Sequence, residues 1–255
     1  STEIRFANRR MVDITNESQP RAIEMNSDGT KMYIAGYADK IVQCTLSTAY
    51  DPESKSAESN ITLSSDNHTT ITDIRGIAWK SDGTKFYVLS DGLNDILEYT
   101  VSTAWDLTST VTFSYEHNVY SQTSYPSGLE FKPDGSRFWI TGSGNIYQYD
   151  LSTDWDLSTL SYDTYENVSG VSNINGLTFN DNGTQAVIVT TGSNNDRLYF
   201  YSLNTAWDIL GTKTLLWYQT IAYNSSGPWN NYTGYNSATR NEMIYDPSDV
   251  HLTDD

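Results

Sequence analysis

The spacing of apolar and polar positions along the chain predicts many short strands. Apolar residues alternate with polar or small ones, as in Ile23 and Met25 or in Ile77 and Trp79. A period of two is typical of β-strands, and long stretches of helix-forming residues are missing from the sequence. Gly, Asp, Asn and Ser separate the apolar runs, which favours tight turns. We therefore expect an all-β protein with almost no helix.

Two sequence markers recur with a shared period. The first is a turn with a glycine, and these glycines (Gly29, Gly83, Gly135 and Gly183) lie 54, 52 and 48 residues apart. The second marker ends in an aromatic residue and an aspartate, at 47–51, 102–106, 152–156 and 204–208. Four copies in one register favour a structural role for the aromatic–Asp pair, in which polar side chains form a turn and the ring covers an outer corner.

Each repeat unit contains four predicted strands. The first precedes the glycine turn, and the Asp-Gly or Asn-Gly pair is expected to supply the positive φ angles of a two-residue hairpin. The second strands are 31–34, 85–88, 137–140 and 185–188, and the third are 41–46, 96–101, 146–151 and 198–203. A looser polar and aromatic stretch forms the fourth, for example 110–115. A four-stranded antiparallel sheet repeated about every 50 residues is the blade of a β-propeller.

The predicted protein is one β-propeller domain over residues 1–255, with five blades of which the last is degenerate. The expected boundaries are 1–19 for the outer strand of the closing blade, then 20–73, 74–125, 126–173 and 174–227 for blades 1 to 4, and 228–255 for blade 5. The N-terminal segment, with Phe6, Met11, Val12 and Ile14, is expected to complete blade 5. In one alternative it forms an intersubunit strand with a neighbouring chain, and in another the chain is a fragment of a longer array.

The repeats resemble those of a known group of propellers. The segments SDGTKMYI, SDGTKFYVLS and PDGSRFWITGSGNIYQYDLSTDWDLST are similar to the repeats of YVTN/NHL/WD40-like propellers, over roughly residues 4–225. The resemblance implies a β-propeller of the kind found in bacterial surface proteins and in structural or tail-associated proteins of aquatic phages. It says little about activity, because propellers include lectins, scaffolds and enzymes.

Charge and cysteine content narrow the choice of partners. The net charge is −17 with only 15 basic residues, and an acidic surface repels phosphate backbones and anionic lipid. We therefore expect no nucleic acid partner and no membrane insertion. Cys44 is the only cysteine, which excludes an intrachain disulfide, and its place in a strand pattern indicates a small buried hydrophobe.

Several asparagines are candidate N-glycosylation acceptors. Seven Asn-x-Ser/Thr sites occur, at Asn16, Asn60, Asn67, Asn167, Asn182, Asn224 and Asn231. Their number slightly exceeds chance and permits a glycosylated exterior. The expected location is extracellular, secreted or at a cell surface, with a virion as the alternative.

Three groups of residues bear on possible chemistry. Glu24 and Glu130 occupy the same inner-strand position in two units, and could act as an acid–base pair across a tunnel or simply line it. The polar loops 90–95 and 193–196 offer oxygen ligands for calcium, although Asp and Asn also favour turns on their own. The three histidines, His68, His117 and His251, show no metal-binding spacing. No other cofactor is expected.

The C-terminal aromatic segment and two arginines complete the candidates. Trp229, Tyr232 and Tyr235 lie among amide and hydroxyl side chains, a combination that suits sugar binding but also suits the core of an irregular closing blade. Arg21 and Arg75 occupy equivalent blade entrances, where they either line the tunnel mouth or hold adjacent loops.

The expected function is that of a non-enzymatic extracellular propeller. It would be a structural or adhesive subunit of a surface assembly, filament or virion, with protein partners or self-assembly. The alternatives are a glycan-binding, lectin-like propeller with a carbohydrate partner and a tunnel-centred glycoside hydrolase.

Overall fold

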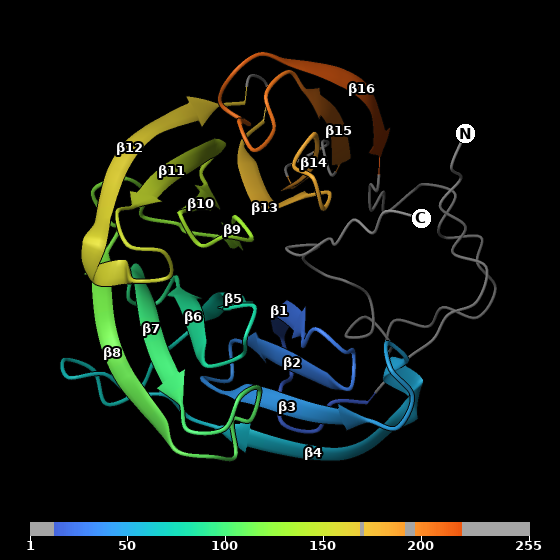
Figure 1. Ribbon diagram of the computed structural model, residues 1–255, viewed down its shortest axis with the longest axis vertical. Helices are drawn as coiled ribbons and strands as arrows, with labels where there is room; N and C mark the ends of the chain where they lie inside the picture. The colour runs from blue at the N-terminus through green and yellow to red at the C-terminus, as the bar shows by residue number, and fades with distance from the viewer. Residues whose placement is uncertain (1–12, 169–170, 192–196, 221–255) are drawn as a thin grey trace.

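Four blades are arranged side by side around a central axis in the computed structural model, which describes residues 13–168, 171–191 and 197–220 (Figure 1). Blade 1 contains β1 (Pro20–Met25), β2 (Lys31–Gly36), β3 (Ile41–Leu46) and β4 (Lys55–Ile61). Blade 2 contains β5 (Ile74–Trp79), β6 (Lys85–Ser90), β7 (Asp95–Val101) and β8 (Val111–Asn118). Blade 3 contains β9 (Gly128–Phe131), β10 (Arg137–Gly142), β11 (Asn145–Leu151) and β12 (Leu160–Asn167). Blade 4 contains β13 (Asn173–Phe179), β14 (Gln185–Thr191), β15 (Arg197–Leu203) and β16 (Lys213–Thr220).

The inner strands β1, β5, β9 and β13 lie next to the axis, and the outer strands β4, β8, β12 and β16 form the rim (Figure 1). The all-β architecture and the four-stranded antiparallel blades are confirmed. The helices of the described residues are the single turns η1 (Pro52–Ser54) and η2 (Leu157–Thr159), so none there could cross a membrane.

The blade count differs from the prediction. The described residues form four blades and not five. The predicted fifth unit, 228–255, and most of the segment 1–19 lie outside the described residues. The fifth blade was predicted as a degenerate unit without the two markers of the other four units, so its sequence signal was weaker.

Aromatic rings between neighbouring blades form the core. The central residue of the second strand packs against the end of the next blade's inner strand, with ring centroids 4.8 Å apart for Tyr33 and Trp79 and 4.5 Å apart for Tyr87 and Phe131. Trp139 and Phe179 repeat this contact at 4.6 Å. Both faces of an inner blade are therefore apolar, because each face is covered by a neighbour.

The glycine turns differ from the two-residue hairpin that the sequence predicts. Only the glycine adopts positive φ, as in Gly29 at 68° and Gly83 at 71°. In the first turn Asp28 instead accepts hydrogen bonds from the backbone N–H of Thr30 (2.9 Å) and from its hydroxyl (2.5 Å). The prediction was wrong because the carboxylate forms a local turn bond in place of a left-handed backbone.

The aromatic–Asp marker has the structural role that the sequence predicts. Trp105 donates its backbone N–H to the carbonyl of Gly83 at 2.9 Å, and its indole lies directly over that glycine. Tyr50, Trp155 and Trp207 lie over their own glycines in the same way. The four aromatic residues have φ between 57° and 64°, a left-handed conformation that this close ring–glycine contact holds in place.

The first two junctions between blades share a set of hydrogen bonds that we call the blade joint. At the junction of blades 1 and 2, Lys31 Nζ and the Tyr33 hydroxyl donate to the Trp105 carbonyl at 2.9 and 2.6 Å. At the next junction, Lys85 Nζ and the Tyr87 hydroxyl donate to the Trp155 carbonyl at 3.0 and 2.7 Å. The second strand of one blade therefore holds the aromatic–Asp turn of the next.

The turn aspartates predict a specific acid sensitivity. Burial raises the pKa of Asp82 and Asp134, but lysine ammonium groups and the hydroxyl and N–H of the following Thr84 or Ser136 outweigh it, so both pKa values fall to about 2. A carboxyl whose pKa is lowered by folding stabilises the folded state fully at pH values above its pKa in the unfolded chain, which is 3.8. This stabilisation is lost as the pH falls toward about 2, the pKa in the folded protein.

We therefore expect the double variant Asp82→Asn, Asp134→Asn to lose less stability than the parent between pH 4 and pH 2. Blade 4 already has Asn182 at this position, with its Oδ1 accepting the Thr184 N–H at 3.1 Å, so the turn tolerates the amide. Urea midpoints measured across this pH range, with Asp154→Asn as the control, would test it. If the urea midpoint fell with pH as steeply in the double variant as in the parent, the two carboxylates would not be the cause of the acid sensitivity.

Candidate functional site

Charged side chains gather where the inner strands of blades 1 and 2 begin. In an antiparallel blade the start of the first strand and the loop between the second and third strands lie at the same edge. Arg21 on β1 and Arg75 on β5 stand at equivalent repeat positions at this edge. Asp73 precedes β5, and Asp91 follows β6. We call these four residues the mouth cluster.

The mouth cluster is a continuous network of ion pairs. Arg75 Nη2 lies 3.0 Å from Asp73 Oδ2 and 2.9 Å from Asp91 Oδ2. Arg21 Nε lies 3.3 Å from Asp73 Oδ1, so Asp73 joins the arginines of two blades. The four side chains are 17–21% exposed. Such partial burial strengthens the electrostatic interactions while leaving an approach from solvent.

Backbone conformation helps to place Asp73. It adopts φ of 45°, and Asp39 in the β2–β3 loop adopts 58°. The Asp73 backbone N–H donates to Asp39 Oδ1 at 3.3 Å, which ties the entrance of blade 2 to a loop of blade 1. Aspartate tolerates the left-handed region better than most residues, because its side chain can form local hydrogen bonds.

The carboxyl of Asp91 has a raised pKa. Burial is the main cause, and the nearby Asp73 carboxylate adds to it, while the guanidinium groups of Arg75 and Arg21 act in the opposite direction. A carboxylate with a raised pKa is a better proton acceptor, and adjacent guanidinium groups can bind an anion or a developing oxyanion. The mouth cluster therefore combines the groups needed for general-base hydrolysis.

The predicted tunnel acids have separate surroundings. Glu24 lies on β1, where its Oε1 accepts the backbone N–H of Met25 at 3.2 Å. Glu130 lies on β9, where its Oε1 accepts the hydroxyl of Thr178 from blade 4 at 3.3 Å. Glu24 therefore has a local bond within β1, whereas Glu130 bonds across the junction of blades 3 and 4.

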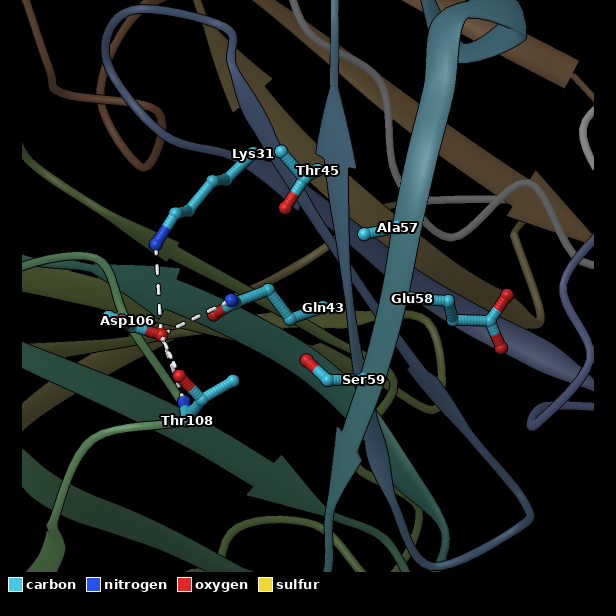
Figure 2. Close-up of a pocket in the computed structure, with 8 residues that line it drawn as sticks. All are labelled: Lys31, Gln43, Thr45, Ala57, Glu58, Ser59, Asp106 and Thr108. Carbon is cyan, nitrogen blue, oxygen red and sulfur yellow. Dashed lines mark hydrogen bonds and ion pairs between the residues drawn. The ribbon is translucent and has the colours of Figure 1, made fainter.

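A hollow of about 300 Å³ between blades 1 and 2 belongs to the blade joint (Figure 2). Gln43 crosses it, accepting the Leu107 N–H through Oε1 at 2.8 Å and donating to Asp106 Oδ1 through Nε2 at 3.3 Å. Lys31 lies 3.7 Å from the same carboxylate. These side chains bind one another across the junction, which gives the hollow a structural explanation.

The predicted calcium loop does not direct its carboxylates to a common point. Asp91 pairs with Arg75, whereas Asp95, at the start of β7, lies 3.4 Å from His68 Nε2 and close to Glu116. Asp95 points toward the imidazole of His68 and not toward Asp91. The potential metal ligands around Asp95 are therefore one nitrogen and several carboxylate oxygens, and not the all-oxygen set expected for calcium. The second calcium candidate, 193–196, lies outside the described residues.

Other predicted site residues fall partly outside the described chain. Trp229, Tyr232 and Tyr235 lie outside it, as do Phe6, Met11 and Val12. Ile14 is described, belongs to no strand, and packs against the apolar face of blade 1 that includes Met32 and Val42. The sugar-binding residues and the intersubunit strand therefore stay predictions.

The glycosylation candidates are distributed over several blades. Asn60, Asn67, Asn167 and Asn182 are exposed, and Asn16 is half-buried with its amide donating to Glu58 Oε1 at 2.7 Å. Asn224 and Asn231 lie outside the described residues. Modification at any of these positions stays a prediction.

Cys44 is a buried free thiol, and burial is the main cause that raises its pKa to about 11, as expected for a core residue.

Solved structures share this fold at low sequence identity. No family model and no curated protein matches the sequence. A protein from Lactobacillus plantarum matches with a TM-score of 0.54 and 12% identity, over 79% of this chain and 55% of its own. A putative 6-phosphogluconolactonase from Bacteroides uniformis matches with a TM-score of 0.53 and 15% identity, over 80% of this chain and 58% of its own.

A periplasmic gluconolactonase from Pseudomonas aeruginosa also matches, with a TM-score of 0.51 and 14% identity, over 79% of this chain and 57% of its own. The chain is a β-propeller. At these identities the likeness establishes the fold alone, and the chain spans just over half the length of each of these structures. The resemblance to propeller repeat proteins is thus confirmed at the level of the fold, and no match singles out the YVTN/NHL/WD40-like group.

These likenesses correct the functional expectation. The predictions of a non-enzymatic protein and of a structural or adhesive subunit were wrong, because solved propellers with this fold are named as lactonases. The lectin-like and glycoside hydrolase alternatives are not better supported. A negative net charge and the lack of a local catalytic motif do not exclude an enzyme whose charged groups come from the loops of separate blades.

Sequence reasoning found half of the mouth cluster. Arg21 and Arg75 share a repeat position, which places them at equivalent blade entrances. Asp73 was missed, and Asp91 was assigned to a calcium loop. The sequence could have placed these two aspartates together. Asp73 directly precedes β5 and Asp91 directly follows β6, and these strands pair through Ile74 and Ser90.

Proposed function

We propose that this chain is part of a hydrolase that opens a lactone, or a related ester of a sugar acid, at the mouth cluster. The observation that carries the proposal is the network of Arg21, Asp73, Arg75 and Asp91. It is supported by the names of propellers with the same fold, a putative 6-phosphogluconolactonase and a gluconolactonase.

The proposed reaction needs a base and a site for negative charge. Asp91 accepts a proton from water as the water oxygen bonds to the lactone carbonyl carbon. The carbonyl oxygen becomes an oxyanion, which the guanidinium groups of Arg75 and Arg21 stabilise. The carbon–oxygen bond of the ring then breaks, the ring oxygen takes up the proton, and the product is the open hydroxy acid.

The raised pKa of Asp91 gives the sign of the pH dependence. Only the ionised carboxylate accepts a proton, so hydrolysis should decline as the pH falls through the pKa of Asp91. Because burial raises that pKa, the decline should begin at a higher pH than 3.8, the ordinary aspartate value.

The test is hydrolysis of glucono-δ-lactone and of 6-phosphogluconolactone by the full chain, above the rate without protein. Asp91→Asn should lower kcat about 100-fold, since removing a general base costs two to four orders of magnitude. Asp154→Asn, an exposed aspartate in an outer turn of blade 3, is the matched control and should retain activity. Full activity in Asp91→Asn, or no hydrolysis of either lactone by the parent, would overturn the proposal.

We also propose a location outside the cytoplasm. The periplasmic location in the name of one similar structure and the exposed glycosylation candidates support it. Fractionation of cells that express the native gene would test the location, and recovery in the cytoplasmic fraction alone would contradict it.

A further inference from the structure

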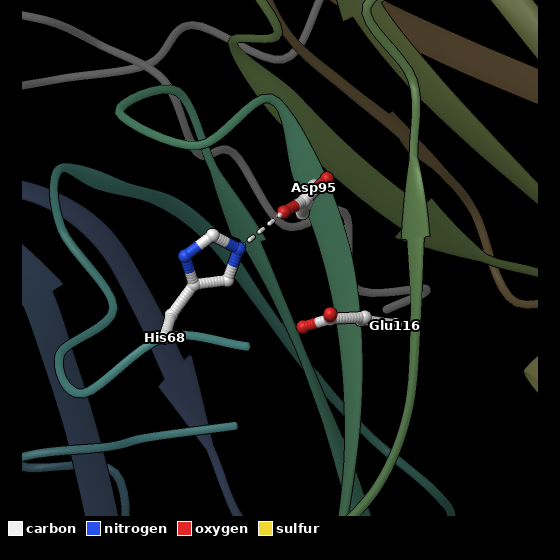
Figure 3. A group of neighbouring side chains, drawn as sticks. All are labelled: His68, Asp95 and Glu116. Atoms are coloured by element: carbon white, nitrogen blue, oxygen red, sulfur yellow. Dashed lines mark ion pairs between the residues drawn. The ribbon is translucent and has the colours of Figure 1, made fainter. Parts of the chain in front are cut away.

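A second group of side chains lies at the outer part of the same blade edge. His68 comes from the loop that joins blade 1 to blade 2, Asp95 begins β7, and Glu116 lies on β8 (Figure 3). One ligand atom from each residue lies within 4.8 Å of the others. The three side chains converge from separate segments on one point (Figure 3). We call them the β7–β8 corner.

Each carboxylate of the corner has one oxygen bound by an asparagine. Asn118 Nδ2 donates to Asp95 Oδ1 at 2.7 Å, while Asp95 Oδ2 lies 3.4 Å from His68 Nε2. Asn67 Nδ2 donates to Glu116 Oε1. Amide donors that hold one oxygen of a carboxylate orient the other, which is the usual arrangement behind metal ligands.

The second oxygen of Glu116 has no hydrogen-bond partner in the described part of the chain. Glu116 Oε2 is shielded from solvent and accepts no hydrogen bond from the described residues. A buried carboxylate oxygen without a donor costs free energy, which a bound cation would recover. The side chain of Asp95 is only 6% exposed, and that of His68 is 33% exposed, so the corner is closed toward the blade and open to solvent beside the imidazole.

Charge in the corner also favours a cation. The corner brings the carboxylates of Asp95 and Glu116 close together beside a single imidazole, that of His68. A divalent ion would offset the repulsion between the two carboxylates.

The repeat supplies an internal comparison. The strand register places Asn145 of blade 3 and Arg197 of blade 4 at the position equivalent to Asp95. The position of Glu116 is occupied by Asn60 in blade 1, Tyr165 in blade 3 and Tyr218 in blade 4. In blade 4 this position pair forms a cation–π contact, with Arg197 4.8 Å from the Tyr218 ring centroid. Among the described blades, blade 2 alone has two carboxylates here, so the repeat architecture does not require them.

We propose that His68, Asp95 and Glu116 bind one divalent transition-metal ion, of which Zn²⁺ fits best. Zinc binds imidazole nitrogen and carboxylate oxygen at about 2.1 Å, so two ligand atoms around it lie about 3.4 Å apart, as His68 Nε2 and Asp95 Oδ2 do. Calcium prefers oxygen ligands alone, and magnesium retains its water. Three protein ligands leave further coordination positions for water.

The turn before His68 fixes the backbone of this residue. Ser65 donates its backbone N–H to the His68 carbonyl at 2.8 Å, and its hydroxyl accepts the His68 N–H at 3.2 Å. This local ring of hydrogen bonds lowers the entropy cost of presenting the imidazole to the metal.

Isothermal titration of the metal-free full chain with Zn²⁺, Mn²⁺ and Ca²⁺ would test the proposal. We expect one Zn²⁺ site, weakened at least about tenfold in His68→Ala and in Glu116→Gln. Glu166→Gln removes the same charge from the outer strand of blade 3, where Glu166 pairs with Lys213, and is the matched control. Thermal unfolding with and without Zn²⁺ should show a higher Tm for the parent and no shift for Glu116→Gln.

Two results would overturn the proposal. One is Zn²⁺ binding by His68→Ala and Glu116→Gln that equals binding by the control, which would place the ion elsewhere on the acidic surface. The other is the absence of Zn²⁺ and Mn²⁺ binding to the parent, which would leave His68 and Asp95 as a structural pair without a metal. Both measurements are independent of lactone hydrolysis.

Discussion

Replacing Gly83 with alanine should lower the free energy of unfolding by about 3 kcal/mol. A Cβ at this position would lie 2.3 Å from the Trp105 indole, and the backbone has φ of 71°. The ring cannot move away freely, because Trp105 is itself held by the Gly83 carbonyl and packs 5.1 Å from the Trp79 ring. Urea unfolding followed by far-UV circular dichroism would measure the loss.

A double-mutant cycle separates the steric clash between the new Cβ and the Trp105 ring from the strain of the positive φ angle. In a Trp105→Gly background the ring is gone, so Gly83→Ala should cost only the positive-φ penalty of about 1 kcal/mol. Ser81→Ala, at an exposed position of the same turn, is the control and should change stability by less than about 0.5 kcal/mol. An equal cost of Gly83→Ala in both backgrounds would show that the ring is not the cause.

Replacing Glu98 with alanine should cost about 3 kcal/mol. The Glu98 side chain is 4% exposed and lies at the junction of blades 2 and 3, which its Oε2 bridges. Oε1 accepts Lys85 Nζ at 2.7 Å and Oε2 accepts the Leu157 N–H at 2.9 Å. Alanine leaves that buried N–H without its acceptor and removes the carboxylate partner of Lys85, which keeps its bond to the Trp155 carbonyl. Urea midpoints at neutral pH would report the change.

The matched variant is Glu98→Gln. Gln43 and Gln148 occupy the same register position in blades 1 and 3, opposite Tyr33 and Trp139, and both are buried. The amide oxygen can still accept the Leu157 N–H, so this variant should lose less than about half as much stability as Glu98→Ala. Equal losses in the two variants would mean that the charge of Glu98, rather than its bridging oxygen, stabilises the junction.

The blades could be predicted because their signals are local and repeated. The alternation of Ile77 and Trp79 and the glycine after Asp82 are each read within a few residues. Repetition removed the ambiguity of any single copy. The turn geometry could not be predicted in the same way, because Asp28 and Gly29 also fit a two-residue hairpin, and only the observed Thr30 contacts distinguish the two.

The candidate sites depend on contacts between loops of different length. Asp73 and Asp91 are 18 residues apart, and His68 and Glu116 are 48 apart, so no spacing rule joins them. Strand register would have placed Asp95 opposite Asn118 and Leu97 opposite Glu116, but the path of the 62–73 loop decides where His68 lies. Residues that lie in register could be paired from the sequence, whereas those on connecting loops could not.

The blade joint affects how such a molecule could gain blades by gene duplication. Blade 2 both holds the turn of blade 3, through Lys85 and Tyr87, and has its own turn held by blade 1. A tandem copy of blade 2 would therefore carry both complementary surfaces and fit beside its parent. Blade 4 has Val187 and Phe200 at the positions of Tyr87 and Glu98, and Phe200 stacks 3.7 Å from Trp217. A duplicated blade would consequently fit more easily beside blade 2 than after blade 4.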